Sequence, residues 1–144
     1  MLKGIDPVLG PDLLHALRSM GHGDEIVIAD ANFPVASHAQ RLVRADGIGA
    51  ERIVRAVAAI MPLDDFVPAA AFSMQVVDAP EKVPPIVERY GCLLSAERYR
   101  GEIVALERSN FYKRARAAFA IVATGETALY ANLILKKGIV RPQS

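Results

Sequence analysis

The stretch Gly21-His22-Gly23-Asp24-Glu25-Ile26-Val27-Ile28-Ala29-Asp30 joins a polar, glycine-flanked loop to a short apolar run that ends on a carboxylate. The β-branched residues within 25–29 predict a buried strand. His22 lies just before this strand and Asp30 just after it. Alpha/beta folds commonly place ligand-binding side chains where a strand ends. We therefore expect His22 and Asp30 to contribute to one polar site, either within one subunit or across two.

Helix-like and strand-like segments alternate on both sides of this stretch. Apolar residues at helical spacing predict four helices, and short apolar or β-branched runs predict six strands. The helices are expected at 11–20, 50–60, 84–94 and 110–118, and the strands at 25–29, 41–44, 72–77, 102–107, 120–124 and 130–135. This alternation favours an α/β fold in which helices flank one sheet.

Two helix boundaries carry local sequence signals. Gly21 is expected to be the C′ glycine of the first helix. Ser109 is expected to be the N-cap of the last helix, because a serine hydroxyl can accept a hydrogen bond from a free amide of the first turn. The apolar face of the second helix is expected to bury four side chains, those of Ile53, Val54, Val57 and Ile60.

The length and composition fit one domain over 1–144. There is no linker and no internal repeat, and 52% of the residues are hydrophobic. This fraction is high for a soluble monomer of this size, so the surplus apolar surface is expected in subunit contacts. The composition therefore predicts a homo-oligomer.

Charge and cysteine content restrict the partners and the compartment. The net charge of +1 provides no global field for nucleic acid or an anionic membrane, and no apolar run reaches the roughly 18 residues that span a bilayer. The first residues show no signal-peptide pattern and the single cysteine cannot form an intrachain disulfide, so we expect a cytoplasmic protein. Cys92 is interpreted as buried filler. The basic residues Lys113, Arg114 and Arg116 are expected on a solvated helix face.

Several motifs, taken together and in order, resemble the RbsD/FucU family of sugar mutarotases, and its L-fucose branch more than its ribose branch. They cover nearly the whole chain, although residues 78–100 match no pattern. The matching motifs are Met1-Leu2-Lys3-Gly4-Ile5, Met20-Gly21-His22-Gly23-Asp24-Glu25-Ile26, Ala29-Asp30-Ala31-Asn32-Phe33-Pro34, Arg44-Ala45-Asp46-Gly47, Phe111-Tyr112, 119–126 and 130–138.

The resemblance implies a compact α/β subunit that assembles into a ring-shaped oligomer, typically a decamer, with sugar sites near subunit contacts. It implies no metal and no organic cofactor. The family's acid/base histidine falls on His22 and its sugar-binding aspartate on Asp30. Arg108, just before the Phe-Tyr pair, follows the fucose-type pattern, where ribose-type proteins tend to carry His. The family's Tyr-x-Asn motif falls on Tyr130 and Asn132.

These residue types suit the exchange of sugar anomers. Opening the ring requires a proton on the ring oxygen and the removal of one from the anomeric hydroxyl. His22 can do both near neutral pH, because the unperturbed pKa of histidine is about 6.5. Asp30 and Asn132 would hold hydroxyl groups, Arg108 would donate hydrogen bonds, and Tyr130 would offer its phenol or its flat face.

Each assignment has a plainer alternative. His22 could cap the carbonyl groups of the first helix as a cation, and Asp30 could only start a turn. Tyr130 and Asn132 share one face of the expected strand, where they could simply pack. His38 could act as a second acid or base, but a surface position is preferred. The three histidines are scattered, without HxH or HExxH spacing, so no metal site is expected.

Several functions therefore remain open at the level of the sequence. The first is a mutarotase that interconverts the α and β anomers of a free monosaccharide, with L-fucose the preferred substrate. A ribose-type pyranase, which interconverts pyranose and furanose rings, is the alternative within the family. A non-catalytic sugar-binding module linked to uptake would share the same pocket. A nucleic-acid or protein scaffold rests only on the basic helix.

Overall fold

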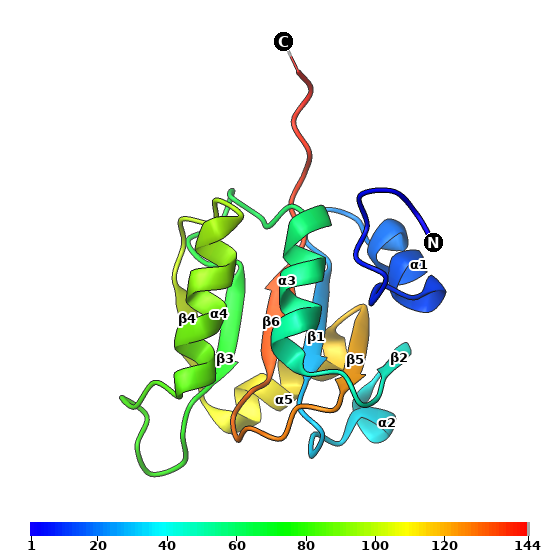
Figure 1. Cartoon of the computed structure of the whole chain (residues 1–144). Helices are drawn as coiled ribbons and strands as arrows, with labels where there is room; N and C mark the ends of the chain where they lie inside the picture. Colours follow the sequence, from blue (N-terminus) through cyan, green and yellow to red (C-terminus); the bar gives the residue numbers. More distant parts are fainter. Residues whose placement is uncertain (144) are drawn as a thin grey trace.

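Figure 1 shows the fold of the chain as a computed structural model, which describes residues 1–143. Within these residues, the four expected helices and six expected strands are present in the expected order, and one short helix, Val35–His38, was not predicted. The helices are α1 (Pro11–Ser19), α2 (Val35–His38), α3 (Ala50–Ile60), α4 (Pro85–Ala96) and α5 (Arg108–Ala117). The strands are β1 (Glu25–Ala29), β2 (Leu42–Ala45), β3 (Ala71–Met74), β4 (Ile103–Leu106), β5 (Ala120–Thr124) and β6 (Leu133–Lys136).

The six strands form one mixed sheet in the order β2-β5-β1-β6-β3-β4. The pairs β1–β5, β2–β5 and β3–β4 are parallel, whereas β6 runs antiparallel between β1 and β3. Nearly all side chains of β1 and β5 are buried. Strands covered on both faces need apolar residues at every position, which explains their continuous apolar runs in the sequence.

Two apolar layers sandwich the sheet. Ile26 and Ile28 of β1 point toward α1, α3 and α4, whereas Val27 and Ala29 point toward α5. Successive side chains of a strand alternate between faces, so one strand supplies both layers. Figure 1 shows α3 and α4 in front of the sheet. The predicted α/β fold with one sheet flanked by helices is confirmed.

The strand directions give the sheet two chemically different edges. The carboxyl ends of β1, β3 and β4 and the amino end of β6 meet at the lower edge in Figure 1. The amino end of β1 and the carboxyl end of β6 lie at the upper edge. Side chains that follow β1 and precede β6 are therefore brought together, and those that precede β1 are kept away from them.

Two strands are shorter than expected. The segment predicted at 72–77 forms a strand only over Ala71–Met74, and the one predicted at 130–135 begins at Leu133. The prediction that Tyr130 and Asn132 lie on one face of a strand is therefore wrong. Tyr130 has a φ of +57°, in the left-handed region, which no strand accommodates.

Of the two expected helix signals, the one at Ser109 is wrong, whereas Gly21 does occupy the C′ position. Ser109 is not the N-cap of α5, because the helix begins at Arg108, two residues earlier than expected, and the Glu107 carboxylate accepts hydrogen bonds from the amides of Ser109 and Asn110. Gly21 follows the C-cap of α1, Met20, but its φ is not positive. The left-handed glycine of this loop is Gly23, with a φ of +90°.

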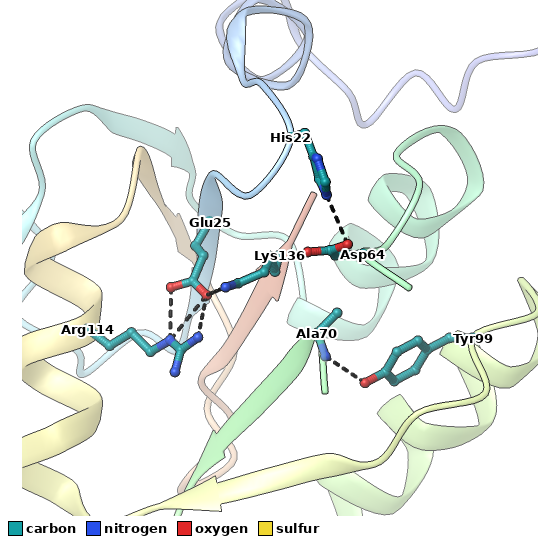
Figure 2. A network of polar contacts seen from close by, with 7 residues as sticks. All are labelled: His22, Glu25, Asp64, Ala70, Tyr99, Arg114 and Lys136. Atoms are coloured by element: carbon teal, nitrogen blue, oxygen red, sulfur yellow. Dashed lines mark hydrogen bonds and ion pairs between the residues drawn. The ribbon is translucent and has the colours of Figure 1, made fainter. Parts of the chain in front are cut away.

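Three expectations about burial are also wrong. Cys92 is exposed, because Tyr90 and Leu94, two residues away on either side, occupy the inner face of α4. Ile60, at the end of α3, keeps 37% of its surface exposed. Arg114 is not fully solvated, since its guanidinium donates to both Glu25 carboxylate oxygens at 2.7–3.1 Å. Figure 2 shows this ion pair.

Within residues 1–143, no helix combines the length and the apolar character needed to cross a bilayer.

Candidate functional site

A cavity of about 300 Å³ opens at the lower edge of the sheet, beyond the carboxyl ends of β1 and β3. Four of the five residues predicted from the sequence line it: Asp30, Arg108, Tyr130 and Asn132. Asp30 follows β1, Arg108 begins α5 directly after β4, and Tyr130 and Asn132 precede β6. The topology thus assembles residues that are up to 102 positions apart in the sequence.

Asp30 and Asn132 form the buried floor of this cavity. The Asp30 amide donates to Asn132 Oδ1 at 2.7 Å, and the Asn32 amide donates to Asp30 Oδ1 at 2.9 Å. Because a backbone amide requires an acceptor, Asn132 Oδ1 is the atom that faces it, and Asn132 Nδ2 is the donor of this side chain. The floor therefore presents a carboxylate oxygen and an amide donor side by side.

Two opposing effects act on the pKa of the Asp30 carboxyl. Burial raises its pKa above the ordinary value, and the amides of Asn32, Phe33 and Ala131, together with Asn132, act in the opposite direction. The effect of burial is the larger one, so ionising Asp30 in the folded protein costs more free energy than ionising an exposed carboxyl. A buried carboxylate of this kind gains from ligand hydroxyl groups that donate hydrogen bonds to it.

Tyr130 lines the cavity and has a strained backbone conformation. A non-glycine residue in the left-handed region costs about 1 to 2 kcal/mol, and such strain persists only where the surroundings impose it. The Tyr130 hydroxyl accepts a hydrogen bond from the Val77 amide at 3.2 Å, which connects this segment to the loop after β3. Strain of this kind is common in ligand sites.

An aromatic wall with one cation completes the cavity. The rings of Phe33 and Tyr112 stack with centroids 5.2 Å apart and an interplanar angle of 10°. The Arg108 guanidinium lies 5.5 Å from the centre of the Tyr112 ring. Met74 adds an apolar surface. The sequence analysis gave no role to Phe33, Met74 or Tyr112, although Phe33 and Tyr112 lie in the motifs that carry the resemblance.

His22 does not lie in this cavity. It precedes β1, whereas Asp30 follows it, and a five-residue strand alone is about 16 Å long. At the upper edge, His22 Nε2 lies 3.0 Å from Asp64 Oδ1, as Figure 2 shows, and the His22 side chain is 44% exposed. The ring also packs on Phe66, with centroids 5.2 Å apart. The expectation of one site within a single subunit is therefore wrong for His22.

Asp64 is the residue of this region that the sequence analysis missed. It is buried, and although burial acts to raise its pKa, hydrogen bonds from His22 and from the Phe66 amide hold the pKa below its ordinary value. An ionised Asp64 can only accept, so neutral His22 carries its proton on Nε2 and leaves Nδ1 free. The only sequence signal was a carboxylate directly after the apolar residues 60–63.

The backbone around Asp64 is fixed by the end of β6. The Asp64 amide donates to the Lys136 carbonyl at 3.0 Å, and the Gly138 amide donates to the Pro62 carbonyl at 2.8 Å. A Cβ atom at Gly138 would lie 2.6 Å from the Leu63 carbonyl oxygen, so glycine is needed for this close approach. The position of the His22–Asp64 pair is thus set by the sheet itself.

The plainer alternative for His22, a cap on α1, is wrong. Lys137 Nζ fills that role, because it donates to the carbonyls of Leu17 at 2.7 Å and Met20 at 2.5 Å. His38 lies beside the aromatic wall, where it contacts Phe33 and Tyr112, and its Nε2 accepts from Arg116 at 3.0 Å. Arginine only donates, so His38 Nε2 is the acceptor in this contact. His38 does not line the cavity.

The arrangement provides two half-sites of different chemistry. The cavity offers one carboxylate, one side-chain amide, one guanidinium and several aromatic faces, a set that suits a small ligand rich in hydroxyl groups. The His22–Asp64 pair offers a group able to take up and release a proton near neutral pH. Among residues 1–143, no cluster of three or more His, Cys, Asp or Glu side chains could hold a metal ion.

Comparisons with known proteins identify the family. The model of the RbsD / FucU transport protein family matches residues 3–140. The fucose mutarotase of Bos taurus is 46% identical over 149 residues, covering 99% of this chain and 97% of the relative. The L-fucose mutarotase of Haemophilus influenzae (strain 86-028NP) is 43% identical over 140 residues, covering 96% and 97%.

A solved structure is similar over the whole fold. The fucose mutarotase from Streptococcus pneumoniae, crystallised in complex with L-fucose, superposes with a TM-score of 0.90 and 45% sequence identity. The match covers 97% of this chain and 100% of that one. The resemblance drawn from the sequence motifs is thus confirmed: this chain belongs to the RbsD/FucU family.

Proposed function

We propose that this protein is a cofactor-independent isomerase that interconverts the α and β anomers of a free monosaccharide, with L-fucose as the preferred substrate. The observation that carries the proposal is the convergence of Asp30, Arg108, Tyr130 and Asn132 in one cavity. The names of the relatives support the same activity, since two of them are fucose mutarotases and the similar crystal structure holds L-fucose. Arg108, which matches the fucose-type pattern, favours L-fucose over D-ribose.

We further propose that a neighbouring copy of the chain supplies His22 to each cavity. Within one chain, β1 separates His22 from Asp30, so no side-chain rotation brings them together. Each half-site lies beside an exposed apolar side chain: Phe66, 61% exposed, packs on His22, and Leu129, 71% exposed, lines the cavity. Contact between the two edges would cover both side chains.

Such a contact has consequences for the assembly. It joins one edge of the sheet to the opposite edge of the next copy, which makes it a heterologous interface. Heterologous contacts that close generate rings. The apolar composition supports a homo-oligomer and a closed heterologous contact would give a ring, while the decameric size is what the family resemblance implies. The cytoplasmic location remains a prediction that rests on the single cysteine, Cys92.

The residues divide the reaction between them. Asp30 and Asn132 hold sugar hydroxyl groups, Arg108 donates to a sugar oxygen, and Tyr130 supports the ring. His22 takes the proton of the anomeric hydroxyl and delivers it to the ring oxygen as the bond between C1 and the ring oxygen breaks, which leaves the open-chain aldehyde. The C1 aldehyde then rotates about the C1–C2 bond, and the reverse proton transfers close the ring on the other face. Proton count and oxidation state are unchanged.

The test is saturation-transfer NMR on the anomeric protons of L-fucose, with D-ribose, L-rhamnose and D-galactose measured alongside. We expect faster exchange of L-fucose, lowered at least about tenfold by His22→Ala. His15→Ala, at an exposed position of α1, is the matched control and should keep full activity.

Other outcomes would favour other functions. Ring-size conversion of D-ribose, without acceleration for L-fucose, would favour the ribose-type pyranase. Saturable sugar binding without acceleration of any exchange, in a folded oligomer, would favour a non-catalytic binding module.

A further inference from the structure

We propose that Tyr90, a residue of α4 outside the cavity, is a positioning residue that holds the backbone segment 130–132 in the conformation that binds the sugar. The inference rests on the proposed function for its kinetic consequences. Its structural content, the control of the segment by one phenol, stands on contacts described below and can be tested without any reaction.

The central contact joins α4 to the middle of this segment. Tyr90 is 0% exposed, and its hydroxyl donates to the Ala131 carbonyl at 2.7 Å. Ala131 is also fully buried and lies between the two cavity residues Tyr130 and Asn132. Its carbonyl shares a peptide plane with the Asn132 amide, so fixing this oxygen fixes the direction in which the chain enters β6.

The segment needs such a restraint for two reasons. Tyr130 has a φ of +57°, which an L-residue leaves unless its neighbours hold it there. Asn132 must keep Oδ1 on the Asp30 amide at 2.7 Å for its Nδ2 to face the cavity. A peptide rotation at Ala131 would disturb both features at once, since Ala131 lies between them.

Tyr90 is suited to this role because the Ala131 carbonyl can only accept and the protonated phenol supplies the donor. Burial raises the pKa of its phenol well above the ordinary value, and the nearby carboxylates of Glu126, Glu51 and Asp30 act in the same direction. The phenol therefore keeps its proton at neutral pH. It does not line the cavity, so it acts through Ala131 and not on the sugar.

The experiment compares two tyrosine-to-phenylalanine variants. Tyr90→Phe keeps the buried ring and removes the hydrogen bond to Ala131. Tyr99→Phe is the matched control, because the Tyr99 hydroxyl also bonds backbone, accepting from the Ala70 amide and donating to the Glu102 carbonyl, each at 2.8 Å. Figure 2 shows Tyr99 bonded to Ala70, which directly precedes β3. Ala71 pairs with Leu135 near the carboxyl end of β6, whereas segment 130–132 precedes the amino end of that strand.

The expected result separates binding from proton transfer. Tyr90→Phe should raise the KM for L-fucose at least about tenfold while the pH dependence of the exchange, set by His22, stays unchanged. Amide hydrogen exchange should rise at Ala131 and Asn132 but not within α4. Tyr99→Phe should lower the melting temperature and leave the KM and these amides unchanged.

Two outcomes would overturn the proposal: an unchanged KM together with unchanged amide exchange at 131–132 in folded Tyr90→Phe, or equal effects of the two variants. If the wild-type protein accelerated no sugar exchange, the proposed function would fail. The Tyr90 proposal would still be decided by the amide exchange.

A second variant covers the case in which Tyr90→Phe does not fold. Glycine adopts a φ of +57° without strain, so Tyr130→Gly should reduce the need for the restraint. In the Tyr130→Gly background, Tyr90→Phe should therefore fold and lower the melting temperature less than in the wild-type background. Equal losses in both backgrounds would show that Tyr90 does not act through the conformation of this segment.

Discussion

At the scale of single residues, the pKa values of the carboxylates in the two half-sites are shifted in opposite directions. Burial raises the pKa of Asp30 above its ordinary value. Asp64 is also buried, but the hydrogen bond from His22 helps to hold its pKa below the ordinary value. Asp30 can therefore accept hydrogen bonds from ligand hydroxyl groups, and Asp64 can orient the imidazole of His22. The two residues should respond to neutralisation in different ways.

We predict that Asp30→Asn separates stability from function. Because the folded state raises the Asp30 pKa, the stability contributed by this group is complete below the ordinary pKa and is lost as the pH rises through the folded value. Asn carries no charge and its oxygen can still accept from the Asn32 amide. The free energy of unfolding at pH 7 should equal or exceed that of the wild type, while sugar exchange falls at least about tenfold.

Chemical denaturation at pH 7 and pH 3, beside the NMR exchange assay, checks this prediction. Any gain in stability should vanish at pH 3, where Asp30 is protonated in both states. A large loss of stability at pH 7 would mean that the charge of Asp30 stabilises the fold.

Asp64→Asn should have the opposite signature. The folded state lowers the Asp64 pKa, so the stability from this group is present above the ordinary value of 3.8 and is lost as the pH falls through the folded value. The variant should be less stable than the wild type at neutral pH, and the difference should shrink at lower pH. Exchange should fall by about 10- to 100-fold, as for other partners that orient a histidine.

Unfolding curves between pH 2 and pH 7 and the pH profile of exchange measure both effects. Asp65→Asn is the neighbouring control, because Asp65 is exposed and pairs with Arg141 at the surface. An unchanged pH profile in Asp64→Asn would remove Asp64 from the reaction.

At the scale of elements, the start of α5 places Arg108. Glu107 caps the helix through the amides of Ser109 and Asn110, and Arg108 is the first helical residue. Serine is the more common N-cap, which is why the sequence pointed to Ser109. Glu107 is the N-cap instead, because β4 ends at Leu106 and Glu107 is the one residue between this strand and the helix.

Glu107→Ala should therefore destabilise the protein by about 1 kcal/mol, the usual effect of losing an N-cap. Ser109→Ala should have a smaller effect, since the Ser109 hydroxyl donates to Glu107 and accepts from no amide of the first turn. Thermal unfolding of both variants distinguishes the two caps. A larger loss in Ser109→Ala would contradict the structure.

At the scale of the whole molecule, the two half-sites lie at opposite edges of one sheet. The proposed ring brings them together only between copies, so each active site draws on two chains. This gives a prediction that no single variant can test. His22→Ala removes the proton-transfer group and Asp30→Ala removes a binding group, so each variant alone should lose at least about tenfold in exchange rate.

Mixed oligomers of the two variants should regain activity. When the subunits are unfolded, mixed in equal amounts and refolded together, about a quarter of the sites combine an intact His22 with an intact Asp30, as expected for a heterologous interface between random neighbours. The exchange rate, measured against each variant refolded alone, checks this outcome. No recovery in oligomers shown to be mixed would refute the proposal that His22 and Asp30 come from different chains.

The sequence by itself determined the parts of this protein that depend on local patterns. The continuous apolar runs of β1 and β5 specified buried strands, because side chains covered on both faces leave no polar position. The motifs around His22, Asp30, Arg108 and the Tyr-x-Asn pair identified the family and four of the cavity residues. Each of these signals lies within a few residues along the chain.

The tertiary structure decided what depends on contacts between distant segments. Asp64 meets His22 only because the end of β6 holds residues 62–64, and Tyr90 reaches Ala131 only because α4 packs on the sheet. The direction of β1 decided that His22 and Asp30 lie at opposite edges. No local pattern encodes these relations, since strand order and the burial of a single polar group follow from how the whole chain packs.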